Sequence, residues 1–130
     1  MAGKLKARVL VVEDEAVIAM LIKYILKSND FDVIATADTG LGALALAEKL
    51  SPDVVLMDIT LKGEMDGIEA ASQMINRWNL PVVFMTSHTD KATYNRAMGI
   101  GPAAYVVKPI NDQKLLEALA SALAPESSPL

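Results

Sequence analysis

Charged and polar side chains follow four short apolar runs of this 130-residue chain, and they are the residues best suited to chemistry. Glu13 and Asp14 follow one run and Asp58 follows another, while Thr86 and Lys108 follow two more. The carboxyl ends of parallel strands meet at one edge of a sheet. If the four runs are such strands, three carboxylates, a hydroxyl and an ammonium share one small space.

Three carboxylates brought so close together repel one another. Two like charges about 4 Å apart cost about 4 kcal/mol at an effective dielectric constant of about 20. Lys108 can offset part of this cost, and so can a divalent cation, for which a ligand set of oxygens alone favours Mg²⁺. Mg²⁺ in proteins often binds a phosphate oxygen, and a carboxylate can act as a nucleophile that forms an acyl phosphate. These residue types therefore indicate phosphoryl chemistry.

Strands must position these groups, and the four runs have the pattern of strands. Most of their residues are apolar at successive positions and β-branched, which is typical of parallel strands covered on both faces. A fifth, mixed run predicts an edge strand. The predicted strands are Val9–Val12, Phe31–Ala37 (the edge strand), Val54–Met57, Val82–Met85 and Ala103–Val107.

Segments with helical periodicity separate the strands. Leu41–Leu50 is rich in Ala and Leu with Thr39 as a plausible N-cap, and the more polar Asp90–Met98 has Gly99 as a C-cap. Apolar residues also recur at the spacing of one helix face near Ile68–Trp78 and Leu115–Leu123. In the first helix, the apolar face comprises Val17, Ile18, Leu21, Ile22, Ile25 and Leu26. Five β-α alternations predict an α/β fold with a doubly wound parallel sheet in a three-layer sandwich.

Composition limits the classes of protein that fit. The length suits one domain, which we place at residues 1–124, with 125–130 as a flexible tail or the start of a linker. The absence of cysteine excludes disulfides, thiolate metal sites and a thiol nucleophile. An excess of acidic residues, 16 against 12 basic ones, gives no electrostatic footprint for nucleic acid. The apolar runs are too short to span a bilayer, so we expect neither nucleic-acid nor membrane binding.

Five motifs occur in an order that resembles the receiver domain of two-component response regulators, from about Arg8 to Leu123. They are "LVVEDE", "VVLMDI", "MDGIEAA", "VVFMTS" and "YVVKP". The resemblance implies five strands in the order 2-1-3-4-5 with five helices. It also implies a cytoplasmic signalling domain that catalyses only its own phosphorylation and dephosphorylation, and is otherwise not an enzyme.

The resemblance implies a role for each polar residue at the sheet edge. Asp58 resembles the aspartate that accepts a phosphoryl group from a phosphohistidine. Asp14 resembles the main Mg²⁺ ligand, Glu13 would hold the ion directly or through water, and the backbone carbonyl of Thr60 would be a further ligand.

The same resemblance implies how phosphorylation is transmitted. Lys108 would pair with Asp58 and later with the phosphoryl group, and the bond from Lys108 to Pro109 would be cis. Thr86 would bond a phosphoryl oxygen, and Tyr105 would turn inward as Thr86 moves. A sensor histidine kinase or phosphotransfer protein would donate the phosphoryl group. A downstream protein or a second copy would bind the face formed by the fourth helix, fifth strand and fifth helix.

Four features depart from the common family pattern. Lys62 stands where a proline is frequent, and Asp66 follows Asp58 by eight residues, which indicates one extra residue in the loop beside the site. Glu13 replaces a frequent aspartate, and Gly101-Pro102 precedes the last strand. We expect His88, the single histidine, to be a loop residue near the site.

Three other functions remain open on the sequence. A pseudo-receiver would bind partners without being phosphorylated. A phosphohydrolase of the haloacid dehalogenase type would need an acidic residue where Thr60 stands. A flavodoxin-like ligand binder would place a flavin phosphate against the acidic cluster, which disfavours it.

Overall fold

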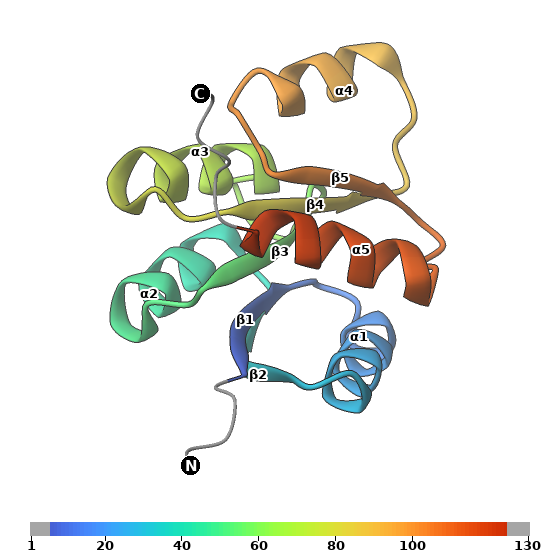
Figure 1. Cartoon of the computed structure of the whole chain (residues 1–130). Coiled ribbons are helices and arrows are strands. Elements are labelled where there is room, and N and C mark those ends of the chain that lie inside the picture. Colours follow the sequence, from blue (N-terminus) through green and yellow to red (C-terminus); the bar gives the residue numbers. More distant parts are fainter. Residues whose placement is uncertain (1–5, 125–130) are drawn as a thin grey trace, which may run out of the picture.

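The computed structural model describes residues 6–124, which alternate strictly between strand and helix (Figure 1). The strands are β1 (Ala7–Val12), β2 (Phe31–Ala37), β3 (Val54–Asp58), β4 (Val82–Thr86) and β5 (Ala104–Val107). The helices are α1 (Ala16–Ser28), α2 (Gly40–Leu50), α3 (Gly67–Trp78), α4 (Lys91–Met98) and α5 (Asp112–Leu123). The sequence-based order of elements is confirmed, whereas the proposed tail at 125–130 lies outside the described residues.

All five strands are parallel and lie in the order β2-β1-β3-β4-β5, as the family resemblance implied. Every residue of β3 and β4 is buried, because helices cover both faces of the sheet at its centre. The strand β2 lies at one edge of the sheet, as predicted, and β5 lies at the other. Only the last residue of β2, Ala37, is fully buried, which agrees with the mixed sequence of this strand.

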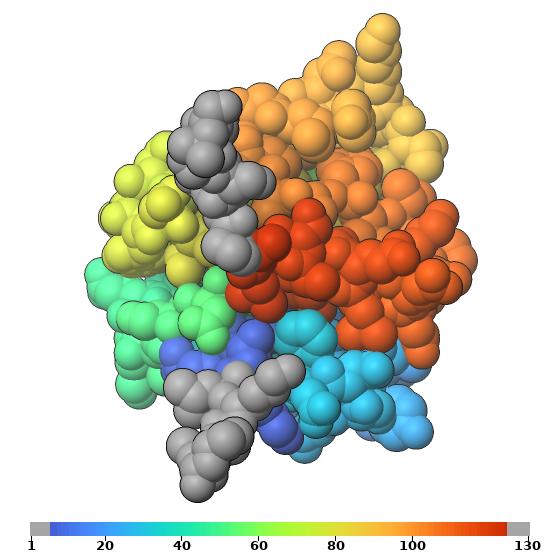
Figure 2. Space-filling view, viewed as in Figure 1, coloured from blue at the N-terminus to red at the C-terminus, as the bar shows by residue number. Residues whose placement is uncertain are grey.

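Two apolar clusters fill the space on either side of the sheet. Side chains of α2 and α3, with Ala97 of α4, pack on one face against Leu10, Val55 and Phe84. Side chains of α1 and α5 pack on the other face against residues such as Val11 and Leu56. The space-filling view shows α5 in red and α1 in blue to cyan lying side by side over the second face (Figure 2). The predicted three-layer sandwich is therefore confirmed.

Helix α1 buries a narrower face than its sequence suggests. Ile22, Ile25 and Leu26 are buried, but Val17 is 79% exposed and Leu21 is 49% exposed. The prediction that all six apolar residues of this helix share one buried face was therefore wrong in part. The six positions cover a wider arc than one sheet can contact, so the flank of the helix stays in solvent.

Helix starts agree with the capping chemistry of the sequence. The Thr39 side chain accepts a hydrogen bond from the Gly42 amide, as predicted. Asp66 and Glu69 form a reciprocal capping box at the start of α3. Gly99 caps α4 with an ordinary right-handed backbone, so a glycine is not required there. No helix within residues 6–124 is long and apolar enough to cross a membrane.

Gly67, the first residue of α3, packs directly on the backbone of the third strand. Its amide donates to the Ile59 carbonyl at 2.8 Å, and a Cβ atom at this position would overlap the Asp58 carbonyl oxygen. The Asp-Gly pair of the sequence thus serves two purposes, because Asp66 caps α3 and Gly67 lets that helix approach the end of β3.

We predict that Gly67→Ala lowers the free energy of unfolding by about 2–3 kcal/mol, because backbone atoms cannot yield to the added methyl group as a side chain could. Gly99→Ala is the matched control, since its Cβ would meet its nearest neighbour, the Asn95 carbonyl oxygen, at 3.3 Å. Urea unfolding followed by circular dichroism measures both variants. Equal stability of the two variants would contradict the close packing described here.

Candidate functional site

The carboxyl ends of β1, β3 and β4 bring together the three buried polar or charged residues found within residues 6–124, which are Glu13, Asp58 and Thr86. Asp58 is the last residue of a fully buried strand, and Thr86 ends the next strand in the sheet. Asp14 lies beside them and is half-buried. The predicted convergence of these residues on one edge is therefore present.

Lys108 is the cation of this cluster. Its Nζ atom lies 2.8 Å from Oε1 of Glu13 and 3.0 Å from Oδ2 of Asp58. Its side chain is only 13% exposed, and its backbone amide donates to the Thr86 carbonyl at 2.7 Å. The peptide bond from Lys108 to Pro109 is cis, as the resemblance implied. The sequence suggested the partner Asp58, whereas the second partner, Glu13, emerges only from the structure.

Backbone amides hold the remaining oxygens of the two buried carboxylates. The Thr60 amide donates to Oδ1 of Asp58 at 3.2 Å, and the Glu15 amide donates to Oε2 of Glu13 at 3.1 Å. Each of these carboxylates therefore has one oxygen on Lys108 and the other on a backbone amide two residues further along the chain. This arrangement fixes the orientation of both groups before any ligand binds.

The two buried carboxyl groups differ in their affinity for protons. Burial, together with the nearby Glu13 and against the opposing effect of Lys108, raises the pKa of Asp58 from 3.8 to about 6. For Glu13, burial also acts to raise the pKa, but hydrogen bonds from Lys108, from the Asp58 carboxyl when it is protonated and from the Glu15 amide outweigh burial, and the pKa is lowered. Burial acts to lower the pKa of Lys108, yet its two carboxylate partners raise it. Glu13 and Lys108 thus form the stable ion pair, and Asp58 is the group that titrates.

The donor set fits a divalent cation. Oxygen atoms of Glu13, Asp14 and Asp58 all lie within 4.8 Å of one another. Against these three carboxylates the cluster has one ammonium group, that of Lys108, which leaves two negative charges when all are ionised. Hard oxygen ligands and this residual charge suit Mg²⁺.

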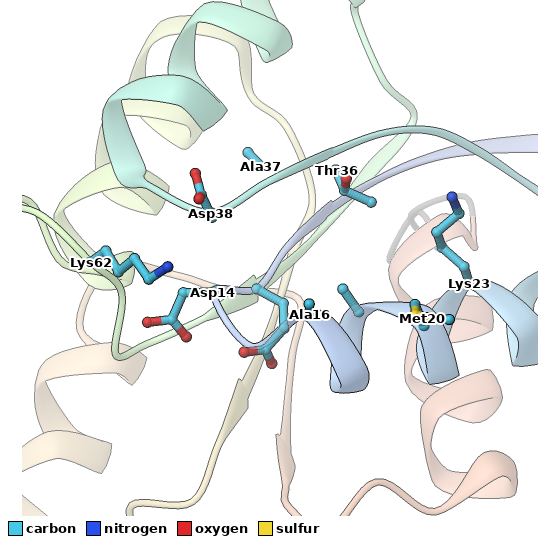
Figure 3. Close-up of a pocket in the computed structure, with 10 residues that line it drawn as sticks. Asp14, Ala16, Met20, Lys23, Thr36, Ala37, Asp38 and Lys62 are labelled. Atoms are coloured by element: carbon cyan, nitrogen blue, oxygen red, sulfur yellow. The ribbon is translucent and has the colours of Figure 1, made fainter.

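A cavity of about 510 Å³ opens beside this acidic cluster (Figure 3). Asp14 and Asp38 contribute carboxylates to its lining, and Lys62 contributes a cation from the loop after β3. In the close-up, the Lys62 side chain extends toward Asp14 and Asp38. The cavity gives a ligand in solvent a route to the half-buried carboxylate of Asp14, whereas the Glu13 side chain stays fully buried behind it.

The longer loop after Asp58 lies against the start of α2. Lys62 forms an isolated parallel bridge with Thr39, Met65 packs on Gly40, and Gly63 turns the chain with φ at +90°. The extra residue is thereby accommodated on the side of α2, where the loop forms one wall of the cavity.

Tyr105 and Thr86 meet through a residue to which the sequence analysis gave no role. The His88 amide donates to Oγ1 of Thr86 at 2.9 Å, and the Tyr105 hydroxyl donates to the His88 carbonyl at 3.1 Å. The His88 ring also contacts Thr60, with Nε2 lying 2.7 Å from Oγ1. His88 is the loop residue near the site that we expected, but nothing in the sequence pairs it with Thr60, 28 residues away.

A family comparison explains the arrangement. The model of the response regulator receiver domain matches residues 9–120. The chain belongs to this family. Receiver domains are signalling modules of two-component systems, which confirms the resemblance drawn from the five motifs.

Curated relatives of this receiver domain include stand-alone and longer proteins. The chemotaxis protein CheY of Listeria monocytogenes is 34% identical over 116 residues, which cover 88% of this chain and 97% of that protein. The transcriptional regulatory protein PdtaR of Mycobacterium tuberculosis is 35% identical over 117 residues. That match covers 90% of this chain but only 57% of PdtaR.

Solved structures share the fold of this receiver domain. The response regulator domain of Thermotoga maritima CheB has a TM-score of 0.85 and 31% identity, covering 95% of this chain and all of that one. The CheX-CheY-BeF₃-Mg²⁺ complex of Borrelia burgdorferi contains a chain with a TM-score of 0.85 and 25% identity, covering 92% of this chain and 90% of that one.

The raised pKa of Asp58 predicts a specific dependence of stability on pH in the absence of divalent cations. The folded receiver binds this proton more tightly than the unfolded chain, so the group stabilises the fold below pH 3.8, and this contribution is lost as the pH rises through about 6. Because asparagine does not ionise, Asp58→Asn should not lose stability in this way as the pH rises. Its free energy of unfolding should rise relative to that of the wild type by up to about 3 kcal/mol across this range.

Urea unfolding at a series of pH values in EDTA measures this difference. Asp53→Asn serves as a control, because Asp53 is an exposed carboxylate at the opposite end of β3. A difference between Asp58→Asn and wild type that is flat with pH, or that falls as the pH rises, would contradict the proton affinity assigned to Asp58.

The shared ammonium predicts that a divalent cation partly replaces Lys108. Lys108→Met leaves the buried carboxylates of Glu13 and Asp58 without their cation, which should cost about 3 kcal/mol of stability at pH 7.5 in EDTA. Millimolar Mg²⁺ should raise the melting temperature of this variant more than that of the wild type. Lys108→Arg, which keeps the charge, is the control, and an equal Mg²⁺ response in all three proteins would contradict the charge balance described here.

Proposed function

We propose that Asp58 accepts a phosphoryl group from the phosphohistidine of a sensor histidine kinase or phosphotransfer protein, in a reaction that requires Mg²⁺. The observation that carries this proposal is the burial of Asp58 at the carboxyl edge of the sheet, between Lys108 and a cluster of two further carboxylates. Membership of the receiver family supports it, as does the cavity that reaches the same cluster.

In the proposed reaction, an oxygen of the Asp58 carboxylate attacks phosphorus and forms a new P–O bond. The P–N bond of the donor breaks, and the imidazole leaves with the electron pair. The pKa of about 6 keeps Asp58 mainly ionised near neutral pH, as a nucleophile must be. The amide of Thr60 and the ammonium of Lys108 hold the carboxylate in one orientation.

Charge must be neutralised as the anionic phosphoryl group approaches this acidic cluster. Glu13, Asp14 and Asp58 would hold Mg²⁺ through carboxylate oxygens, with the Thr60 carbonyl as a further ligand. The bound ion would supply positive charge to the phosphoryl oxygens. Lys108 lies 3.0 Å from Asp58 and would pair with the phosphoryl group after transfer.

The conformational output would run through Thr86 and Tyr105. Thr86 Oγ1 accepts from the His88 amide, and a hydroxyl that accepts can still donate its proton to a phosphoryl oxygen. Tyr105 packs edge-on against Tyr94 of α4, with ring centroids 5.1 Å apart. Movement of either ring would alter the face of α4, β5 and α5, where Met98 and Val107 are also exposed.

That face is our proposed surface for a downstream protein or a second copy of the chain. Thr89, Lys91, Tyr94, Tyr105 and Val107 line a cavity of about 350 Å³ on it. We propose a cytoplasmic setting and no enzymatic activity beyond the chain's own phosphorylation and dephosphorylation, as receiver membership implies. The pseudo-receiver alternative predicts the same surface without phosphorylation.

Incubation with acetyl phosphate and Mg²⁺, followed by intact mass measurement, tests the reaction. We expect one phosphoryl adduct in the wild type and none in Asp58→Asn or after removal of Mg²⁺ with EDTA. Asp53→Asn should react as the wild type does, because this carboxylate lies at the far end of β3. No adduct in the wild type would favour the pseudo-receiver, and turnover of small phosphomonoesters would favour a phosphohydrolase.

A further inference from the structure

His88 lies where the carboxyl ends of three neighbouring strands meet. Its ring nitrogen Nε2 is 2.7 Å from Oγ1 of Thr60, which belongs to the loop after the acceptor strand β3. Its amide donates to Oγ1 of Thr86 at the end of β4. Its carbonyl accepts the hydroxyl of Tyr105, which comes from β5. One residue thus contacts groups from three neighbouring strand ends.

These contacts form a continuous path from the acceptor to the aromatic residue. The Thr60 amide donates to Oδ1 of Asp58, and the Thr60 hydroxyl meets the His88 ring. The His88 backbone then receives the Tyr105 hydroxyl. Within this path, the bond between His88 and Thr60 joins two side chains, and both residues are exposed.

We infer that the His88 side chain is a positioning residue that anchors the loop between β4 and α4 to Thr60, and so holds the carbonyl that receives Tyr105. The inference rests on the proposed switch at Tyr105 and extends it to a residue outside the acceptor, the cation site and the switch pair. It implies that the chain favours the Tyr105–His88 bond before phosphorylation, because the anchor exists without a phosphoryl group.

The geometry makes the anchor compatible with phosphorylation. Thr86 Oγ1 uses a lone pair to accept from the His88 amide, so its proton remains available for a phosphoryl oxygen. The Thr60 hydroxyl can donate to or accept from an imidazole nitrogen, so the contact does not depend on one tautomer. The phosphoryl group would therefore reinforce the arrangement that the anchor already favours.

The experiment follows Tyr105 by fluorine NMR of protein labelled with 3-fluorotyrosine, with Tyr105→Phe assigning the signal. His88→Ala removes the ring but keeps the backbone carbonyl that accepts from Tyr105. Without phosphoryl donor, we expect His88→Ala and Thr60→Val to shift the Tyr105 equilibrium by roughly two- to tenfold away from the bonded state, as the loss of one modest hydrogen bond would. The double variant should lose no more than either single variant.

Conservative substitutions separate an anchor from a general structural role. His88→Gln places an amide nitrogen near the position of Nε2 and should restore the wild-type signal, whereas the shorter His88→Asn should not. Thr60→Ser keeps the hydroxyl and should behave as the wild type. Ser87→Ala is the matched control, since this exposed neighbour lies in the same loop.

An unchanged Tyr105 signal in both His88→Ala and Thr60→Val would overturn the inference, as would additive effects in the double variant. Intact mass after treatment with acetyl phosphate and Mg²⁺ is recorded on the same samples. If the wild type takes no phosphoryl group but the His88 and Thr60 variants show the shift, the proposed function is refuted and the anchor is supported. If the wild type is phosphorylated but the variants show no shift, the proposed function is supported and the anchor is refuted.

Discussion

One ammonium group shared by two buried carboxylates holds the functional edge of this protein together. Lys108 bonds Glu13 from the loop after β1 and Asp58 from the end of β3, and its own backbone is tied to Thr86 at the end of β4. A buried carboxylate without a partner would be strongly destabilising. The negative charge that remains after this pairing is what makes the edge suitable for a divalent cation and a phosphoryl group.

The buried sheet makes such a charged edge possible. Every residue of β3 and β4 is buried. The carboxylate of Asp58 therefore extends from a rigid strand and not from a mobile loop. Gly67 adds to this rigidity, because the lack of a side chain lets α3 rest on the Asp58 backbone. The free energy gained from apolar burial thus offsets the cost of holding like charges together.

Conformational coupling at this edge depends on weaker contacts than the charge pair. The hydrogen bonds of His88 join Thr60 in the loop after β3, Thr86 at the end of β4 and Tyr105 in β5. Thr60 is exposed and Tyr105 is half-buried. Exposed hydrogen bonds contribute little to stability and can therefore be exchanged at small cost. Under the proposed function, the ion pair would fix the acceptor Asp58, and the weaker hydrogen bonds would let Tyr105 change its position on phosphorylation.

The sequence by itself determined the order of elements, the buried strands and the polar residues at the strand ends, because each is a local pattern in residue type. Tertiary structure alone decided that Lys108 also bonds Glu13, that His88 meets Thr60 and that Val17 and Leu21 of α1 stay in solvent. It also decided that the longer loop lies against α2. These outcomes depend on strand register and on how much of each helix the sheet can cover. The spacing of residues along the chain determines neither.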